Sequence, residues 1–160
     1  CALPISKLIN LQPLGGTELE KALIIYGSST GNTEKIAQVL AQELESRYNV
    51  TLLDVIDATP RDMETNDLLL LGSSTWYDGQ LQEDFQEFYD RMDEVDLKGK
   101  RVAVFGTGDS VWDEFCAAVD ILEEKARDLH ADIMAPGYKW DGELTEETLP
   151  DIKTWASKLH

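Results

Sequence analysis

Near the N-terminus, a short apolar run is followed by a loop of small, hydroxyl-bearing residues and then by a run with helical spacing. The apolar run covers residues 21–26, and the loop, GSSTGNT, covers residues 27–33. A continuous apolar run of this length is typical of a strand buried on both faces, as in a parallel sheet covered by helices. The order of strand, short loop and helix therefore favours an α/β fold built from crossover units.

The rest of the chain repeats this alternation. Further strands are predicted over residues 50–55, 67–72, 101–105 and, more weakly, 131–139. Helices are predicted over residues 34–48, 81–92, 114–129 and from Thr148 onward, where the spacing to Asp151 fits a capping box. Residues 54–66 have only a poor helical signal. The pattern predicts a doubly wound parallel sheet with helices on both faces.

The loop at residues 27–33 has the composition of a phosphate-binding turn. Hydroxyls and backbone N–H groups converge at such a turn, and the positive end of the next helix lies behind them. The loop has no Lys or Arg, so it lacks the ending of a Walker A loop, and it lacks the G-x-G-x-x-G spacing. A single terminal phosphate, and hence a mononucleotide, fits best. The alternative is a simple turn in which Asn32 or Thr33 only caps the helix.

Composition narrows the class of protein. The 160 residues suit one domain, and the formal net charge is −17. A surface this acidic disfavours nucleic acid and anionic membranes, and it favours basic partner proteins or only aids solubility. The sequence contains no apolar stretch long enough to span a bilayer. We therefore expect a monomer with no nucleic-acid partner and no membrane span.

Cysteine and histidine are scarce. Cys1 and Cys116 form no CxxC pair, so we expect no disulfide framework and a reducing, cytoplasmic location. His130 and His160 leave little for a metal site or a Ser-His-Asp triad, so no metal and no catalytic residue is predicted. Residues 1–20 show no sustained period and are interpreted as a leader, a linker or a segment added for expression, ahead of a domain over residues 21–160. A lipid-bearing Cys1 is an alternative.

Two more loops follow predicted strands and should emerge at the same edge of the sheet. Residues 73–79 read SSTWYDG, and residues 106–112 read GTGDSVW. Glycines let the backbone approach a ligand closely, and aromatic side chains stack on planar rings. Together the two loops predict a planar ring held beside the phosphate, although each aromatic alone would more often pack under its neighbours.

The loops at residues 28–33, 75–79 and 106–109 resemble those of the flavodoxins, and the resemblance extends from about residue 21 to the C-terminus. It implies a flavodoxin-like five-stranded parallel sheet in the order 2-1-3-4-5, of the short-chain type. It also implies a non-covalently bound FMN cofactor. The protein would be a low-potential one-electron carrier that shuttles electrons between redox enzymes and has no substrate turnover of its own.

The resemblance also implies which residues hold the cofactor. Residues 28–33 would bind the phosphate, Thr75 and Trp76 would border the inner face of the ring, and Trp112 would stack on its outer face. The backbone of residues 107–109 would bond the pyrimidine edge. The full expected set is Ser28, Ser29, Thr30, Gly31, Asn32, Thr33, Ser74, Thr75, Trp76, Tyr77, Asp78, Gly79, Thr107, Gly108, Asp109, Trp112, Phe115 and Cys116. Packing is the expected role of Cys116.

An acidic run follows the second loop. It consists of Glu83, Asp84, Glu87, Asp90, Asp93, Glu94 and Asp96. This run is interpreted either as a docking face for basic patches on redox partners or as an ordinary solvated helix face. Two alternative functions remain on the same fold: an FMN-dependent quinone or nitro reductase, and the FMN domain of a larger diflavin reductase. A phosphorylated receiver domain is disfavoured, because no acids cluster after the first strand.

Overall fold

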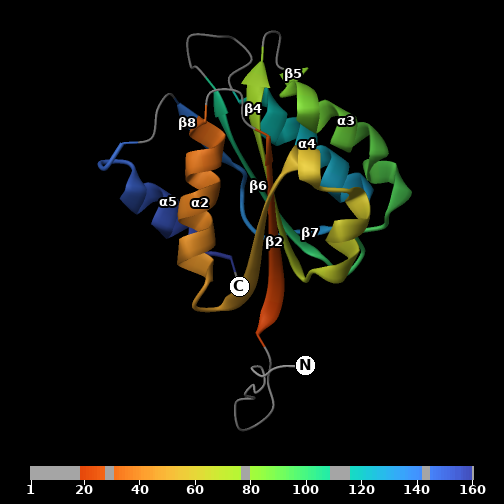
Figure 1. Ribbon diagram of the computed structural model, residues 1–160, viewed down its shortest axis with the longest axis horizontal. Coiled ribbons are helices and arrows are strands. Elements are labelled where there is room, and N and C mark those ends of the chain that lie inside the picture. Colours follow the sequence, from red (N-terminus) through yellow and green to blue (C-terminus); the bar gives the residue numbers. More distant parts are fainter. Residues whose placement is uncertain (1–18, 28–30, 77–79, 109–115, 142–144, 160) are drawn as a thin grey trace, which may run out of the picture.

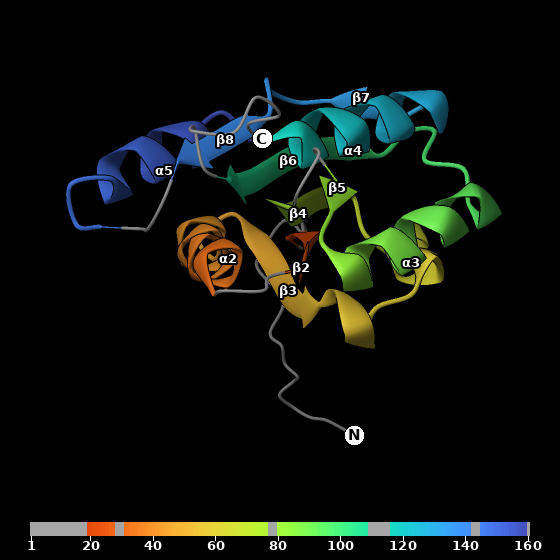
Figure 2. The ribbon, with the colours of Figure 1, turned by 90° about the horizontal axis from the view of Figure 1, so that it is seen from above.

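The computed structural model describes residues 19–27, 31–76, 80–108, 116–141 and 145–159. Its centre is a twisted parallel sheet with helices on both faces (Figure 1; Figure 2). The strands are β2 (Glu20–Gly27), β3 (Tyr48–Asp54), β4 (Leu68–Trp76), β6 (Arg101–Gly108), β7 (Asp132–Ile133) and β8 (Tyr138–Asp141). Their order is β3-β2-β4-β6-β7, and β8 also pairs with β6. This confirms the predicted order 2-1-3-4-5.

The fifth strand is split, as the interruption at Pro136 and Gly137 predicts. β7 pairs with the first residues of β6, and β8 pairs with its last four. Proline lacks an N–H and cannot donate to a ladder, so the strand breaks between its two halves. A further short strand, β5 (Gln80–Leu81), pairs antiparallel with the end of β4. The sequence analysis did not predict β5.

Helices cover the sheet in pairs. On one face lie α2 (Asn32–Leu44) and α5 (Leu149–Ala156), and on the other lie α3 (Glu83–Arg91) and α4 (Ala117–Asp128) (Figure 2). The leucines of β4 alternate between the two faces, with Leu69 and Leu71 in one core and Leu68 and Leu70 in the other. All four are fully buried, and each such burial stabilises the fold by about 1.5–3 kcal/mol.

Several predicted boundaries are wrong. The first helix ends at Leu44 instead of residue 48, because Tyr48 already opens β3 with its ring buried. The predicted helix 81–92 is α3 followed by the 3-10 helix η4 (Met92–Glu94). The crossover at 54–66 forms two 3-10 helices, η1 (Val55–Asp57) and η2 (Pro60–Thr65), which agrees with its poor helical signal. Within the predicted helix 114–129, the described part is α4.

Capping also differs from the prediction. The side chain of Thr148 caps nothing at α5, because its hydroxyl instead donates to the carbonyl of Thr145 at 2.6 Å. A cap that the sequence analysis missed lies at η2, where the Asp62 carboxylate accepts the Thr59 N–H at 2.9 Å. Both segments are short, and spacing alone does not decide which local bond forms.

Candidate functional site

The candidate site lies where β2, β4 and β6 end and α2 begins (Figure 1). β4 continues through Ser73, Ser74 and Thr75, and β6 continues through Gly106 to Gly108, although both stretches were predicted as loops. The parallel register places Gly27 beside Ser73, and Ser74 beside Thr107. The polar ends of three adjacent strands therefore form one edge, as expected for a binding site in a doubly wound fold.

The N-terminus of α2 is built around Gly31. This residue is the N-cap, with φ 93°, a left-handed conformation that favours glycine. Glycine has no side chain to accept the first N–H groups of the helix, and among the described residues no side chain caps it. The alternative in which Asn32 or Thr33 is only a capping residue is therefore wrong. The α2 N-terminus can instead offer its backbone donors to an anion.

Three buried hydroxyls meet behind this helix end. Thr33 Oγ1 lies 2.8 Å from Thr107 Oγ1 and 3.2 Å from Ser74 Oγ. The exposed fractions of the three residues are 0% for Thr33, 5% for Thr107 and 8% for Ser74. Ser74 Oγ also lies 3.5 Å from the Gly27 carbonyl. This hydroxyl cluster (Thr33, Ser74 and Thr107) links α2, β4 and β6, so three predicted site residues from distant parts of the sequence are brought together.

Two hydrogen bonds, one from Ser73 and one from Thr75, attach α3 and α4 to the end of β4. Ser73 Oγ accepts the Gln82 N–H at 3.1 Å, and Gln82 Oε1 accepts the Phe85 N–H at 3.0 Å, which caps α3. Thr75 Oγ1 accepts the Ala118 N–H at 3.0 Å, in the first turn of α4. The Thr75 side chain is thus already engaged with the fold, which fixes the end of β4 between α3 and α4.

Close packing fixes the end of β6. Cys116 is fully buried, with its sulfur 3.9 Å from the Gly106 carbonyl oxygen and 3.5 Å from that of Trp140. A Cβ on Gly108 would lie 3.0 Å from the Cys116 nitrogen and 3.2 Å from its sulfur. The expected packing role of Cys116 is therefore confirmed. Gly108 lets the backbone of β6 approach the first residue of the α4 turn.

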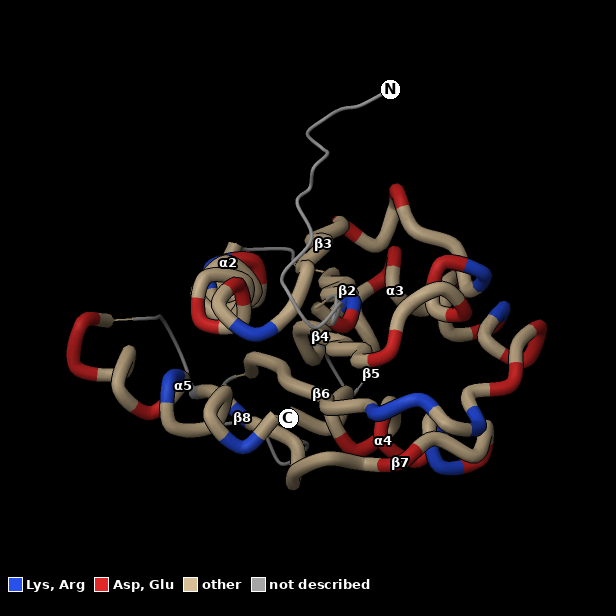
Figure 3. The backbone as a smooth tube through the Cα atoms, turned by 90° about the horizontal axis from the view of Figure 1, so that it is seen from below, with Lys and Arg blue, Asp and Glu red and all other residues tan. Residues whose placement is uncertain are grey.

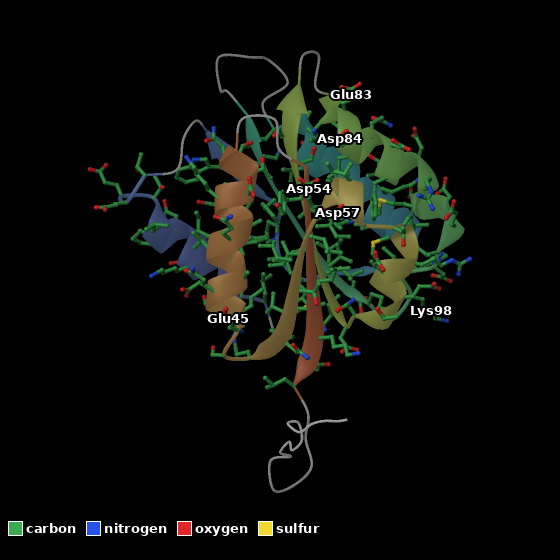
Figure 4. The ribbon with its side chains drawn as sticks, viewed as in Figure 1. Glu45, Asp54, Asp57, Glu83, Asp84 and Lys98 are labelled. Atoms are coloured by element: carbon green, nitrogen blue, oxygen red, sulfur yellow. The ribbon has the colours of Figure 1, made fainter. Side chains whose placement is uncertain are left out.

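The electrostatic field at this edge is negative. Tyr26, at the end of β2, donates a hydrogen bond to Glu34 Oε2 at 3.1 Å. Burial, followed by Glu34 and then by Asp54 and Asp57, raises the pKa of Tyr26 to about 12. In Figure 4, Asp54, Asp57 and two acids of α3 lie in the half of the molecule where the strands end. An added negative charge at this edge would be disfavoured by the same acids.

The acidic run that follows the second loop begins at the start of α3. The acids of the run are all exposed, but only its second half is neutralised: Asp93 pairs with Lys125, Glu94 with Arg91, and Asp96 with His130. Within the described residues, no ion pair involves the acids of the first half, which are Glu83, Asp84, Glu87 and Asp90. Acidic residues recur on every helix (Figure 3), and Glu83 and Asp84 lie in the first turn of α3, on the side of the molecule where the strands end (Figure 4).

Part of the predicted site lies outside the described residues. This part comprises Ser28, Ser29, Thr30, Tyr77, Asp78, Gly79, Asp109, Trp112 and Phe115, together with the side chain of Trp76. The structure adds residues that the sequence analysis missed, namely Tyr26, Glu34, Ser73 and Gln82. Ser73 was detectable from its place beside Ser74. The role of Gln82 as an N-cap was not, since glutamine is an uncommon cap. Among the described residues, no three His, Cys, Asp or Glu side chains form a metal site.

Together, the sheet order and the uncharged donors at its carboxyl edge define a doubly wound nucleotide-binding protein. The chain belongs to the flavodoxin family of FMN-binding electron carriers, since the flavodoxin family model matches residues 24–155. It is 41% identical over 145 residues to a flavodoxin of Maridesulfovibrio salexigens, an alignment covering 88% of this chain and 97% of that protein. A flavodoxin of Synechocystis sp. is 35% identical, with 88% and 96% covered.

A solved structure agrees. The crystal structure of oxidised flavodoxin 1 from Bacillus cereus superposes with a TM-score of 0.83 at 34% identity. The alignment covers 86% of this chain and 95% of that one. No helix in the described part of the chain is both long and apolar enough to cross a membrane.

The residues present fit the phosphate end of FMN. A phosphate needs hydrogen-bond donors, and the site offers the N–H groups of the α2 N-terminus together with the hydroxyl cluster. The hydroxyl cluster carries no charge of its own, so it adds donors without adding a competing carboxylate. Bound FMN would supply the redox chemistry, and the protein would supply position and field.

Proposed function

We propose that this protein is a low-potential one-electron carrier that holds FMN non-covalently and passes electrons between separate redox enzymes. The observation that supports this most directly is the hydroxyl cluster behind the α2 N-terminus, in a chain of the flavodoxin family. The alignments cover almost the whole length of the two flavodoxin relatives described above. Because these relatives are themselves flavodoxins, we propose a carrier with no substrate turnover of its own.

The cofactor would extend along the carboxyl edge of the sheet. Residues 28–33 and Ser74 would hold its phosphate, and Thr75, Trp76 and Trp112 would border its ring. The backbone of residues 107–109 would bond the pyrimidine edge, with Tyr77, Asp78 and Gly79 beside the ring. Phe115 and Cys116 would support the third loop from below. Two tryptophans over the ring would leave little room for a quinone or nitro substrate, which disfavours the reductase alternative.

The acidic field supports a low potential. Adding an electron to a flavin that already carries one places negative charge near Asp54, Asp57 and the start of α3. One unit charge about 8 Å away costs about 2 kcal/mol at an effective dielectric of about 20. That cost is on the order of 90 mV for a one-electron couple. Solvent ions screen exposed acids, so the net effect of each is smaller.

Partner docking is proposed at the surface between η1 and α3. Ile56 is 69% exposed there, beside a groove of about 180 Å³ with an apolar floor formed by Val55, Ala58 and Phe88. Asp84, Glu87 and Arg91 line the same groove, and Arg91 is paired with Glu94. A partner that presents Lys or Arg side chains would place their methylenes on the floor and their charges against the carboxylates. We propose that the carrier acts as a monomer in the cytoplasm.

The proposed function is tested by the visible spectrum of the purified protein during stepwise anaerobic reduction. Flavin bands, followed by the transient long-wavelength absorbance of a one-electron-reduced flavin, are the expected result. Direct conversion to the two-electron state, with rapid oxidation of NAD(P)H by the protein alone, would instead support the reductase. A colourless protein that does not take up added FMN would contradict the cofactor assignment.

The docking surface is tested with a basic c-type cytochrome as electron acceptor. The double variant D84N/E87Q of the reduced holoprotein should transfer electrons about threefold more slowly at low ionic strength, because two steering charges are lost. The difference should disappear at high salt, where exposed charges are screened. The matched control E146Q/E147Q removes two exposed acids near α5. Equal slowing by both variants would show that only net charge matters and would contradict the docking site.

A further inference from the structure

We infer that Thr107 is a positioning residue, whose side-chain hydroxyl orients the hydroxyl of Thr33 toward the phosphate of the cofactor. This inference rests on the proposed function. It gives the Thr107 side chain a role different from that of its backbone, which is expected at the ring. The basis is the hydroxyl cluster, in which Thr107 Oγ1 makes the shortest contact, 2.8 Å, to Thr33 Oγ1.

Counting protons shows why Thr107 matters. Each hydroxyl has one proton to donate and can accept two. If Thr33 donates to Thr107 or to Ser74, its proton is used inside the cluster and is not available to an anion. If Thr107 donates to Thr33, and Ser74 donates to Thr33 or to the Gly27 carbonyl, the proton of Thr33 remains available. An anion at the α2 N-terminus favours this second arrangement, because the hydroxyl dipoles then point toward negative charge.

Burial strengthens the coupling. Thr33 is fully buried, so no bulk water competes for its hydroxyl, and a neighbouring donor polarises it. Thr107 lies on β6, in register with Ser74 on β4, whereas Thr33 lies on α2. The Thr107 side chain therefore connects the phosphate end of the site to β6. The backbone at the end of β6 is expected at the ring.

The test compares two flavins that differ only in the phosphate. The dissociation constants of FMN and riboflavin are measured by fluorescence titration of the full chain freed of flavin. In Thr107→Val, which keeps the shape and removes the hydroxyl, FMN should bind about two- to tenfold more weakly, since one hydrogen bond is lost. Riboflavin should bind with unchanged affinity. Thr107→Ser keeps the hydroxyl and should retain the wild-type ratio of the two constants.

A double-mutant cycle tests whether Thr107 affects FMN affinity through Thr33. In a Thr33→Val background, Thr107→Val should cause no further loss of FMN affinity, because the residue through which it acts is gone. Thr107→Cys, with a weak donor, is measured in place of Thr107→Val if the valine variant fails to fold. Equal weakening of both flavins, an unchanged FMN constant, or additive effects in the cycle would each overturn the inference. Failure of the wild-type protein to bind FMN would instead refute the proposed function.

Discussion

The two edges of the sheet are built in different ways. At the carboxyl edge, the described side chains that join α2, β4 and β6 are neutral hydroxyls, and glycines allow close approach. At the amino edge, charges do this work: Arg101 contacts Glu20 at 2.7 Å and the Tyr48 hydroxyl at 3.4 Å. Lys100 likewise donates to the Glu64 carbonyl at 2.8 Å. At the amino edge, the charged side chains bond to other groups of the protein. At the carboxyl edge, the hydroxyls can still donate to a ligand.

The largest effect is expected at the amino edge, at Arg47. Its guanidinium donates to the carbonyls of Ala156 and Leu159, at 2.9 Å and 2.8 Å, and so ties the end of α5 to α2. Arg47→Met should lower the free energy of unfolding by about 2–4 kcal/mol, because charge-assisted bonds are each worth about 1.5–3 kcal/mol. Urea unfolding measures this.

Arg61→Met is the matched control for Arg47. Among the described residues, Arg61 pairs only with Glu64, and its side chain is 68% exposed, so the change should stay within about 0.5 kcal/mol. FMN affinity should be unaffected in both variants, since neither residue lies at the carboxyl edge. A weaker FMN complex in Arg47→Met would break the separation between the two edges.

A smaller effect, with a different signature, is expected at Gly106. A Cβ there would lie 2.5 Å from the Ser73 carbonyl oxygen and 2.8 Å from Val119 Cγ2, and backbone cannot yield easily. Gly106→Ala should cost about 1–3 kcal/mol of stability and should also weaken FMN binding, because β4 must shift at the site.

Gly99, beyond the amino edge, provides the comparison. Its φ is +83° and nothing lies within 4 Å of the added Cβ, so Gly99→Ala should cost only the backbone strain, about 1 kcal/mol. Its FMN affinity should equal that of the wild type. Thermal unfolding measures the stability of Gly106→Ala and Gly99→Ala, and flavin titration measures their FMN affinity. Equal loss of FMN affinity in the two variants would contradict the assignment of the site to one edge.

The smallest effect concerns two tyrosines. Tyr26→Phe loses the bond to Glu34 and should cost about 1 kcal/mol at pH 7. Tyr138→Phe should be neutral or slightly stabilising, because the buried Tyr138 hydroxyl has no hydrogen-bond partner among the described residues. Urea midpoints of the two variants decide this, and a larger loss in Tyr138→Phe would refute it.

The same tyrosines set a pH dependence. Burial is the main cause that raises both pKa values, from 10.0 to about 12. The unfolded chain therefore loses these protons first, so the free energy of unfolding falls as pH rises from about 10 through 12. Each Phe variant should have a shallower fall than the wild type over this range. An unchanged slope in Tyr26→Phe would mean that the acids around it do not disfavour its phenolate.

The sequence predicts the strands and the functional edge well, because both depend on local patterns, whereas the sheet order is implied by the resemblance to the flavodoxins. Apolar runs mark strands, and the small residues of 27–33 and 106–108 mark the strand ends that face a ligand. It does not predict that Thr33, Ser74 and Thr107 share hydrogen bonds, because they lie far apart in the chain. Arg47 is missed for the same reason, as its acceptors are backbone carbonyls of α5, which no side-chain pattern reveals.

The tie between Arg47 and α5 has a consequence for how the chain is made. The face of the sheet under α2 is completed by Ile152, Trp155, Ala156 and Leu159, which are made after all the described strands of the sheet. Until they emerge, the buried faces of β2 and β4 on that side lack half of their cover. The nascent protein therefore carries an open apolar surface until α5 has been made, and the docking of α5 removes a surface that could aggregate.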